Sequence, residues 1–289
     1  MDVIKGSVLG LCLLLPVAGQ ASGPRITAKM EAGNKINHTG NQRLLSQELI
    51  LSVCMVLSDV DAATHAERAW FAAQQFEDVL DGLAHGDNDL GLLAEENPAI
   101  LEALGQMAGS WQVLGPATRQ IVSGDRHSVP VTQVIEIDAQ MRVQAETAAD
   151  RAESHYGAIA LDPDLARAIN LISHERMLLA QVAKDACFIS IDLSRAHSRD
   201  EIIKAARAIE TALALLENGD EAAGIAAPPN GFIPFSLKKV QKKWERLKPQ
   251  IEQLSTGAPL SLAALSSFVK ECNALSKAVQ AVAVLYIKS

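Results

Sequence analysis

The sequence repeats itself at a constant spacing of 133 residues, without a gap between Ile36 and Gly124 of the first copy. More than twenty of these 89 positions are identical in the second copy, and Trp111 and Trp244, two of the three tryptophans, form one such pair. A constant period marks a duplicated structural unit. We therefore expect two domains of one fold, over residues 35–156 and 168–289, and any chemistry that the repeat carries should occur twice.

Both copies read as helical, because apolar residues recur at helical spacing and no alternating pattern of useful length indicates a strand. Gly86-Asp87 should close one helix, Asn97-Pro98 should open the next, and Pro116 should kink or restart that helix. Short connections favour antiparallel neighbours. The predicted fold is all-α, with two tandem up-and-down four-helix bundles after a cleaved signal peptide. The expected helices are 35–60, 64–85, 97–122 and 130–156 in the first copy, and 163–194, 199–218, 234–255 and 260–287 in the second.

The N-terminus has the pattern of an export signal. Lys5 gives a positive start, residues 8–15 are apolar, Pro16 interrupts them, and cleavage after Ala21 fits the small residues there. The apolar stretch is too short to span a bilayer comfortably, and no later segment qualifies as a span. We expect residues 1–21 to be a signal peptide and the mature protein to be soluble and periplasmic.

Charge and motifs exclude several function classes. A formal net charge of -8 argues against a nucleic-acid partner, since phosphate binding needs clustered cations. The one basic run, 238–248, is interrupted by Val240, Trp244 and Leu247, so it reads as the solvated face of a helix. There is no glycine-rich phosphate loop, no metal-spaced His/Cys cluster and no nucleophile elbow. We therefore expect no enzymatic activity, no metal and no cofactor.

Three cysteines remain after cleavage, namely Cys54, Cys187 and Cys272. An odd count leaves at least one thiol unpaired within the chain, and the favoured interpretation is that all three are buried and inert. The alternative is a Cys54–Cys187 disulfide. It requires the first helices of the two copies to pack side by side in parallel, with these Cα atoms within about 7 Å.

The first helix of each copy carries an unusual stripe. Steps of four and three residues align Ile36, Gly40, Arg43, Gln47, Ile50 and Cys54, and in the second copy Ile169, Ser173, Arg176, Ala180, Ala183 and Cys187. Each arginine thus lies among small or apolar residues, where its permanent charge needs an acceptor. Its planar donors suit a carboxylate, a phosphate or a planar oxyanion. The alternative is an arginine at the edge of the buried face, paired with a surface acid.

These residues resemble a known family. The pattern Ile36-Asn37-x-x-Gly40-x-Gln42-Arg43-x-Leu45-Ser46-Gln47 is similar to the signature helix of the NarX-like, or PilJ-like, sensor domain. That domain is the extracytoplasmic four-helix module of nitrate/nitrite sensor kinases and of type IV pilus chemotaxis transducers. The second copy keeps Ile169, Asn170, Arg176 and Leu178, but it has Ser173, Glu175, Leu179 and Ala180 where the pattern has Gly, Gln, Ser and Gln.

The resemblance implies a sensory role in which the signature arginines bind an anion, such as nitrate or nitrite, where two signature helices meet across a dimer axis. Carried over, the candidate ligand-binding residues are Arg43, Arg176, Asn37, Gly40, Gln47, Asn170 and Ser173, with Arg43 the first choice. The duplication suggests that one chain supplies both arginines, as an internal pseudo-dimer. Glu175 is a candidate counter-ion for Arg176, and His38 and His174 read as structural or solvated.

Two functions follow from the sequence. The first is a periplasmic ligand-binding or sensory accessory protein, whose signal passes to a separate membrane sensor or pilus-associated protein. The second is a docking protein of the cell envelope that has no small-molecule ligand. In both cases a further homodimer is left open.

Overall fold

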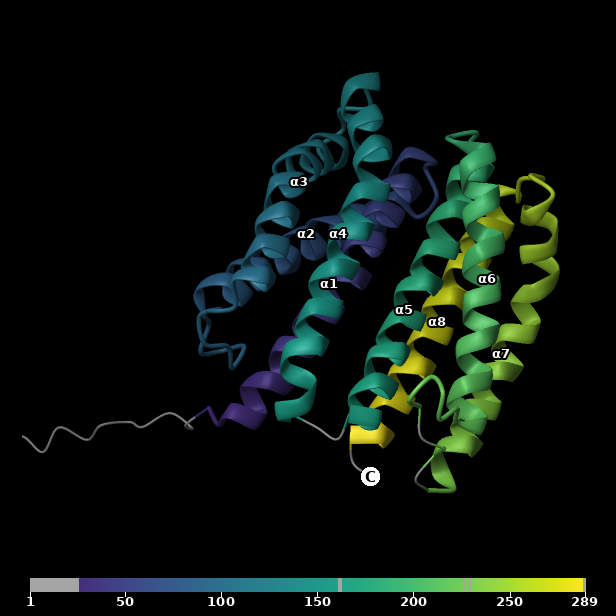
Figure 1. Cartoon of the computed structure of the whole chain (residues 1–289). Helices are drawn as coiled ribbons and strands as arrows, with labels where there is room; N and C mark the ends of the chain where they lie inside the picture. The colour runs from purple at the N-terminus through teal and green to yellow at the C-terminus, as the bar shows by residue number, and fades with distance from the viewer. Residues whose placement is uncertain (1–25, 161–162, 226, 229, 288–289) are drawn as a thin grey trace, which may run out of the picture.

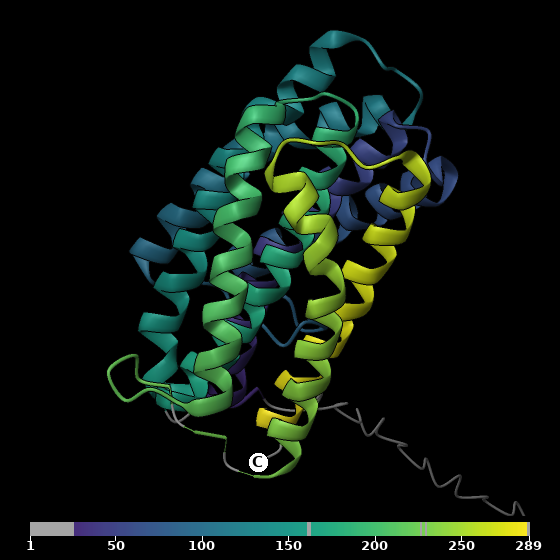
Figure 2. The ribbon, with the colours of Figure 1, turned by 90° about the vertical axis from the view of Figure 1, so that its right-hand side faces the viewer.

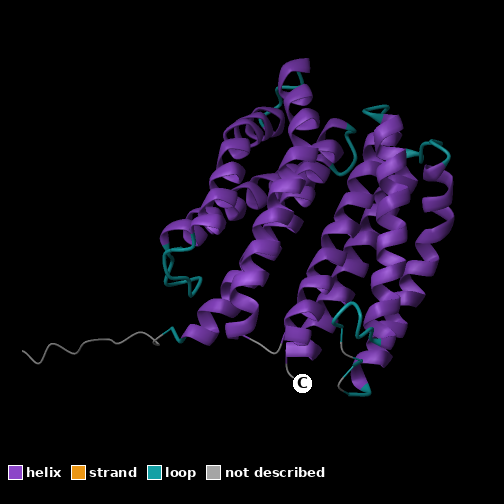
Figure 3. Cartoon of the chain, in the orientation of Figure 1, coloured by secondary structure: helices purple, strands orange, loops and turns teal. Residues whose placement is uncertain are grey.

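The computed structural model describes residues 26–160, 163–225, 227–228 and 230–287, so the expected signal peptide lies outside the described residues. Within these ranges the chain forms eight helices and no strand (Figures 1 and 3), which confirms the all-α prediction. None of the described helices has the length and apolar character needed to cross a membrane. The helices are α1 (Ala28–Leu57), α2 (Ala62–His85), α3 (Pro98–Val122), α4 (Ser128–Ala160), α5 (Pro163–Ser190), α6 (Arg195–Asn218), α7 (Phe232–Ser255) and α8 (Leu262–Ile287).

The helix ends follow the local signals in the sequence. Gly86 closes α2 with a φ of 90°, a conformation that glycine adopts without steric cost. Asn97 caps α3, because its side chain accepts hydrogen bonds from the backbone amides of Ala99 and Ile100, and Pro98 occupies the first turn. The expected restart at Pro116 is absent, since α3 runs through this residue to Val122.

The 133-residue period is also present in the backbone. Asp59 and Asp192 end equivalent turns in the left-handed region, with φ of 57° and 60°. The loop after α2 is pinned by an isolated bridge between Asp87 and Leu92, and the loop after α6 by the equivalent bridge, Asp220–Ile225. The two copies therefore share their turns as well as their helices.

The two copies pack against each other along α1 and α5, which lie side by side and run in the same direction (Figures 1 and 2). Within the first copy α1 contacts α2, α3 and α4, and within the second α5 contacts α6 and α8. The buried apolar residues form one main cluster that extends through both copies. The bundles thus share a core and are more than two modules joined end to end.

Equivalent residues meet where α1 and α5 touch. A Cβ atom on Gly40 would lie 3.1 Å from the Ser173 Oγ, and Cys54 is joined to Cys187 by a disulfide with a Cα–Cα distance of 6.2 Å. In both contacts the two residues are one repeat apart, and the contacts lie at two different heights along the helices. They therefore place α1 and α5 in parallel register about a local two-fold axis. The favoured expectation of inert thiols at these two cysteines is therefore wrong. Only Cys272 is free among the described residues, and it is buried.

Candidate functional site

Arg43, the signature arginine of the first copy, lies inside the protein with only 1% of its surface exposed. Its Nη1 donates to Glu146 Oε1 on α4 at 3.1 Å, and its Nη2 donates to the Asn170 side chain on α5. Gly40 provides the room, because a Cβ there would lie 3.4 Å from the Arg43 Nη2. A buried guanidinium needs such acceptors, and here the chain itself supplies them.

The acceptors of Arg43 belong to a polar network between α4 and α5. His174 also hydrogen-bonds to Glu146 Oε1, at 3.1 Å, and Asn170 donates to Glu153. Burial alone would raise the pKa of Glu146, but the hydrogen bond from His174 and the charge of Arg43 outweigh it and lower this pKa to about 2. Burial raises the pKa of Asp150 and of Glu153. Arg43 is thus neutralised within the protein, by a carboxylate that stays ionised.

The other residues predicted for the first copy lie apart from this network. Gln47 is fully buried and donates to Asp138 Oδ1 at 3.0 Å, and Lys184 forms an ion pair with the same carboxylate. Asn37 is exposed and makes no side-chain hydrogen bond to any described residue. The structure therefore brings Arg43, Gly40, Asn170 and Ser173 together across the two copies, but not Asn37.

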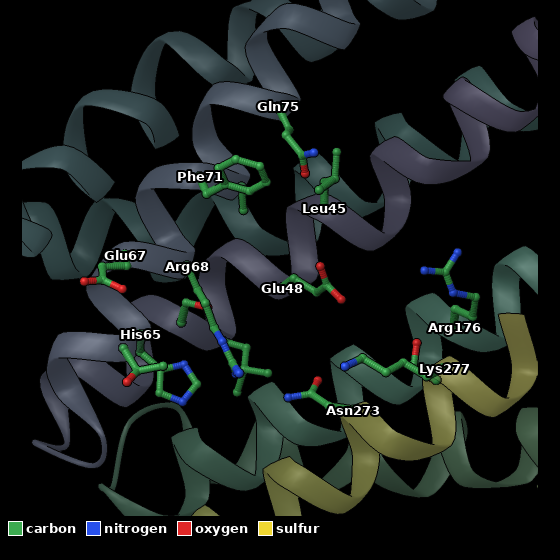
Figure 4. Close-up of a pocket in the computed structure, with 15 residues that line it drawn as sticks. Leu45, Glu48, His65, Glu67, Arg68, Phe71, Gln75, Arg176, Asn273 and Lys277 are labelled. Atoms are coloured by element: carbon green, nitrogen blue, oxygen red, sulfur yellow. The ribbon is translucent and has the colours of Figure 1, made fainter. Parts of the chain in front are cut away.

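Arg176, the signature arginine of the second copy, lies in a different environment. It is only partly buried, its Nη1 donates to Gln280 on α8, and its Nε has no hydrogen-bond partner. It lines a cavity of about 790 Å³ between α1, α2, α5 and α8 (Figure 4). Arg43 donates to Glu146 on α4 and Asn170 on α5, whereas Arg176 donates to Gln280 on α8, so the two guanidinium groups share no acceptor.

Three cations line this cavity without a carboxylate partner. Arg68 from α2, Arg176 from α5 and Lys277 from α8 have no carboxylate within 4.0 Å among the described residues. Figure 4 shows their side chains extending into the same space as Glu48. Asn273 from α8 adds an amide group. The cavity thus offers several hydrogen-bond donors and unneutralised positive charge.

Two groups beside these cations, Glu48 and His65, have pKa values shifted toward their neutral forms. Burial raises the pKa of Glu48, although the charges of Arg176 and Arg68 oppose the shift. Burial, helped by Arg68, lowers the pKa of His65 to about 4. Glu175, the candidate counter-ion for Arg176, does not form an ion pair with it in the described structure. Its buried carboxyl oxygens have no hydrogen-bond partner in the described structure, and burial raises its pKa well above the usual range.

On the other side of the local two-fold axis, the equivalent residues hydrogen-bond to their neighbours. Glu201, which replaces Arg68 in the repeat, accepts hydrogen bonds from Arg142 and Gln181, both at 3.1 Å. Gln181 replaces Glu48 in the same way. The two copies have therefore diverged around their arginines, so that one side is a closed polar network and the other is an open cavity.

Sequence reasoning missed Arg68, His65, Asn273 and Lys277. They lie on α2 and α8, outside the signature helix, and none is retained in the other copy. The available signal was the difference between the copies. At two of these positions the other copy has a residue that is not a cation: Arg68 corresponds to Glu201, and Lys277 corresponds to Gln144.

An all-α chain with two equivalent helical units and a ligand-sized polar cavity between them has the organisation of a helical sensory module. The chain matches the family described as type IV pili methyl-accepting chemotaxis transducer N-term over residues 27–137 and 164–268, once in each copy, and it belongs to that family. A comparison with curated proteins found no similar sequence. Domains of this family are sensory and typically periplasmic.

Proposed function

We propose that this protein is an exported sensory protein that binds an anionic ligand in the cavity between its two copies, with Arg176 as the main anchor. The observation that carries the proposal is the convergence of three unpaired cations, Arg68, Arg176 and Lys277, on one cavity. Arg176 is partly buried, and a positive charge in such a partly desolvated position attracts a negatively charged ligand, because the interaction is stronger there than in bulk water.

The geometry favours an oxyanion or a carboxylate. The Arg176 guanidinium offers a planar set of donors that matches these groups, and Lys277 and Asn273 add further donors from α8. Nitrate and nitrite are the candidates that the resemblance of the signature helix suggests. A cavity of about 790 Å³ also has room for a larger organic anion. A carboxylate group of that organic anion would then bind Arg176 in place of nitrate or nitrite.

Arg176 is a better candidate than Arg43 on electrostatic grounds. An anion at Arg43 would have to displace Glu146, whose pKa is lowered to about 2 and which therefore stays charged. We infer that Arg43, Gly40, Asn170 and Ser173 hold α1 against α5, and that Asn37 and Gln47 do not contact the ligand.

The family suggests how a signal would leave the protein. We propose that ligand binding changes how the chain is recognised by a separate membrane sensor or pilus-associated partner. The cavity is formed by α1 and α2 of the first copy and by α5 and α8 of the second. A bound ligand would therefore bridge the copies and alter the surface that they present together.

A thermal-shift and calorimetric screen tests this function. Nitrate, nitrite, acetate and glutamate would be titrated into wild type, Arg176→Gln and Lys277→Gln. The matched control is Arg119→Gln, which removes an exposed cation that pairs with Glu77 on α2 at 3.6 Å. Binding to the native state at a hundred times the dissociation constant stabilises the fold by about 2.7 kcal/mol.

We expect at least one of these anions to raise the melting temperature of wild type and of Arg119→Gln, with a much weaker effect in the two cavity variants. A shift that persists in Arg176→Gln would place the site elsewhere. Failure of every anion to shift wild type would favour the alternative function, a docking protein of the cell envelope without a small-molecule ligand.

A further inference from the structure

The helix α7 lies at the outer edge of the second copy, where it packs against α6 and α8 (Figures 1 and 2). Its inner face is apolar and buried, through Ile233, Leu237, Val240, Trp244 and Leu247. The last three of these residues interrupt the basic run in the sequence. The cations between them therefore point away from the core.

The side of α7 opposite to its buried face is both aromatic and basic. At helical spacing, its residues fall within a sector about 100° wide that contains no acidic residue. Phe232 and Phe235 are 74% and 59% exposed at its first turn, and the cations continue along the next three turns. We call this sector the α7 outer face; it consists of Phe232, Phe235, Lys239, Lys242, Lys243 and Arg246.

None of the four cations of the α7 outer face has a carboxylate partner in the described structure, a feature that they share with the cations of the cavity. Several exposed cations on other elements are paired, as in Arg126–Asp59, Arg195–Asp192 and Lys270–Asp61. Only the Lys239 Nζ has a near neighbour of another kind, the ring of Phe235, at 4.2 Å. The face is thus an unneutralised positive strip on a chain whose net charge is -8.

A solvated helix face explains the cations but not the two phenylalanines. Exposed aromatic rings beside a row of cations are the features with which helices bind membrane surfaces: the rings enter the boundary between headgroups and acyl chains, and the cations meet lipid phosphates. From Phe232 to Arg246 the face extends about 21 Å along the helix. A strip of this length that contains no acidic residue suits a surface that carries many mobile negative charges.

We propose that the α7 outer face binds the surface of membranes that contain anionic phospholipids. Phe232 and Phe235 enter the interface, and Lys239, Lys242, Lys243 and Arg246 contact lipid phosphates. The site is separate from the cavity at Arg176, so it does not depend on the proposed ligand. Its effect would be to hold the sensory cavity close to the membrane.

Flotation with lipid vesicles tests the proposal. The full mature chain would be mixed with vesicles of phosphatidylcholine alone, or with added phosphatidylglycerol, at low and at physiological salt. We expect binding only to the anionic vesicles, and weaker binding at the higher salt. Each cation near such a surface contributes about a fivefold change in partitioning, so the triple variant Lys239→Gln/Lys242→Gln/Arg246→Gln should bind about a hundredfold more weakly. Phe232→Ser/Phe235→Ser should also bind more weakly.

Two controls keep the result specific. Arg126→Gln/Arg195→Gln/Lys270→Gln removes the same charge from other elements, and Arg176→Gln removes a cation of the cavity; both should bind anionic vesicles like wild type. Equal loss in the two triple variants would overturn the assignment to α7, as would equal binding of wild type to neutral and anionic vesicles. Binding to polyglutamate without binding to anionic vesicles would assign the face to an acidic protein and would also overturn the proposal. All residues changed on α7 are exposed, and unchanged thermal unfolding would confirm that the variants are folded.

Discussion

Opening the Cys54–Cys187 disulfide should weaken the whole fold and not only one copy. The bond joins residues 133 positions apart, one full repeat, and both sulfurs lie in the core that the two copies share. A cross-link that closes a loop of this size lowers the entropy of the unfolded chain enough to stabilise the native state by about 5 kcal/mol. Because the core is continuous, we expect a single unfolding transition that reports this loss.

Urea unfolding followed by circular dichroism measures the effect. We would compare oxidised wild type, reduced wild type and Cys54→Ala/Cys187→Ala, and we expect the last two to have unfolding free energies lower by about 3–5 kcal/mol. Without the cross-link the unfolded chain exposes more surface, so the urea dependence should become steeper. Cys272→Ala is the matched control. It removes a buried thiol outside the bond, so it should respond to reductant as wild type does.

Two results would refute this reasoning. One is an unfolding midpoint of wild type that does not change on reduction. The other is mass spectrometry under non-reducing conditions that finds free thiols at Cys54 and Cys187. A double-alanine variant that still responds to reductant would show that the effect has another source.

Three further predictions test individual contacts. Burial raises the pKa of Glu175, so the folded protein favours the protonated carboxyl. Stability should therefore fall as the pH rises from about 4.3, the pKa of Glu175 in the unfolded chain, through its higher pKa in the folded protein. Glu175→Gln should remove this fall in melting temperature, and Gln42→Glu, at the equivalent position of the first copy, should introduce one. Glu146→Gln leaves a buried guanidinium without its carboxylate and should cost about 3 kcal/mol in urea unfolding at neutral pH. Since the pKa of Glu146 is lowered to about 2, that cost should shrink as pH falls from about 4.3 toward 2. Gly86→Ala should destabilise more than Gly124→Ala, because both have positive φ but only at Gly86 would the new Cβ lie 2.8 Å from a backbone nitrogen; equal melting temperatures would contradict this.

Most helix ends could be predicted closely because they depend on local chemistry, whereas α1 begins at Ala28, well before the expected residue 35. Gly86, Asn97 and Pro98 act within one or two turns of their own positions, so their effect can be read from adjacent residues. At Pro116 the local signal left a kink or a restart open, and α3 continues through this residue to Val122 without a restart.

The cavity could not be predicted because its residues meet only through tertiary packing. Arg176 lies on the signature helix and was identified from the repeat, whereas Arg68 and Lys277 come from α2 and α8, more than a hundred residues away on either side. The partner of Arg43 was hidden in the same way, because Glu146 is 103 residues further along the chain. The disulfide required a distance between helices that no spacing within one helix supplies.

The local two-fold axis between α1 and α5 has a consequence for stoichiometry. In a symmetric homodimer each substitution appears on both sides of the axis, so a change that closes one site closes its twin. Here both halves belong to one chain, and Arg142 pairs with Glu201 on one side while the other side keeps its cavity. Each molecule should therefore hold one ligand at this site. Its affinity should not change on dilution, because no subunit has to associate to complete the site.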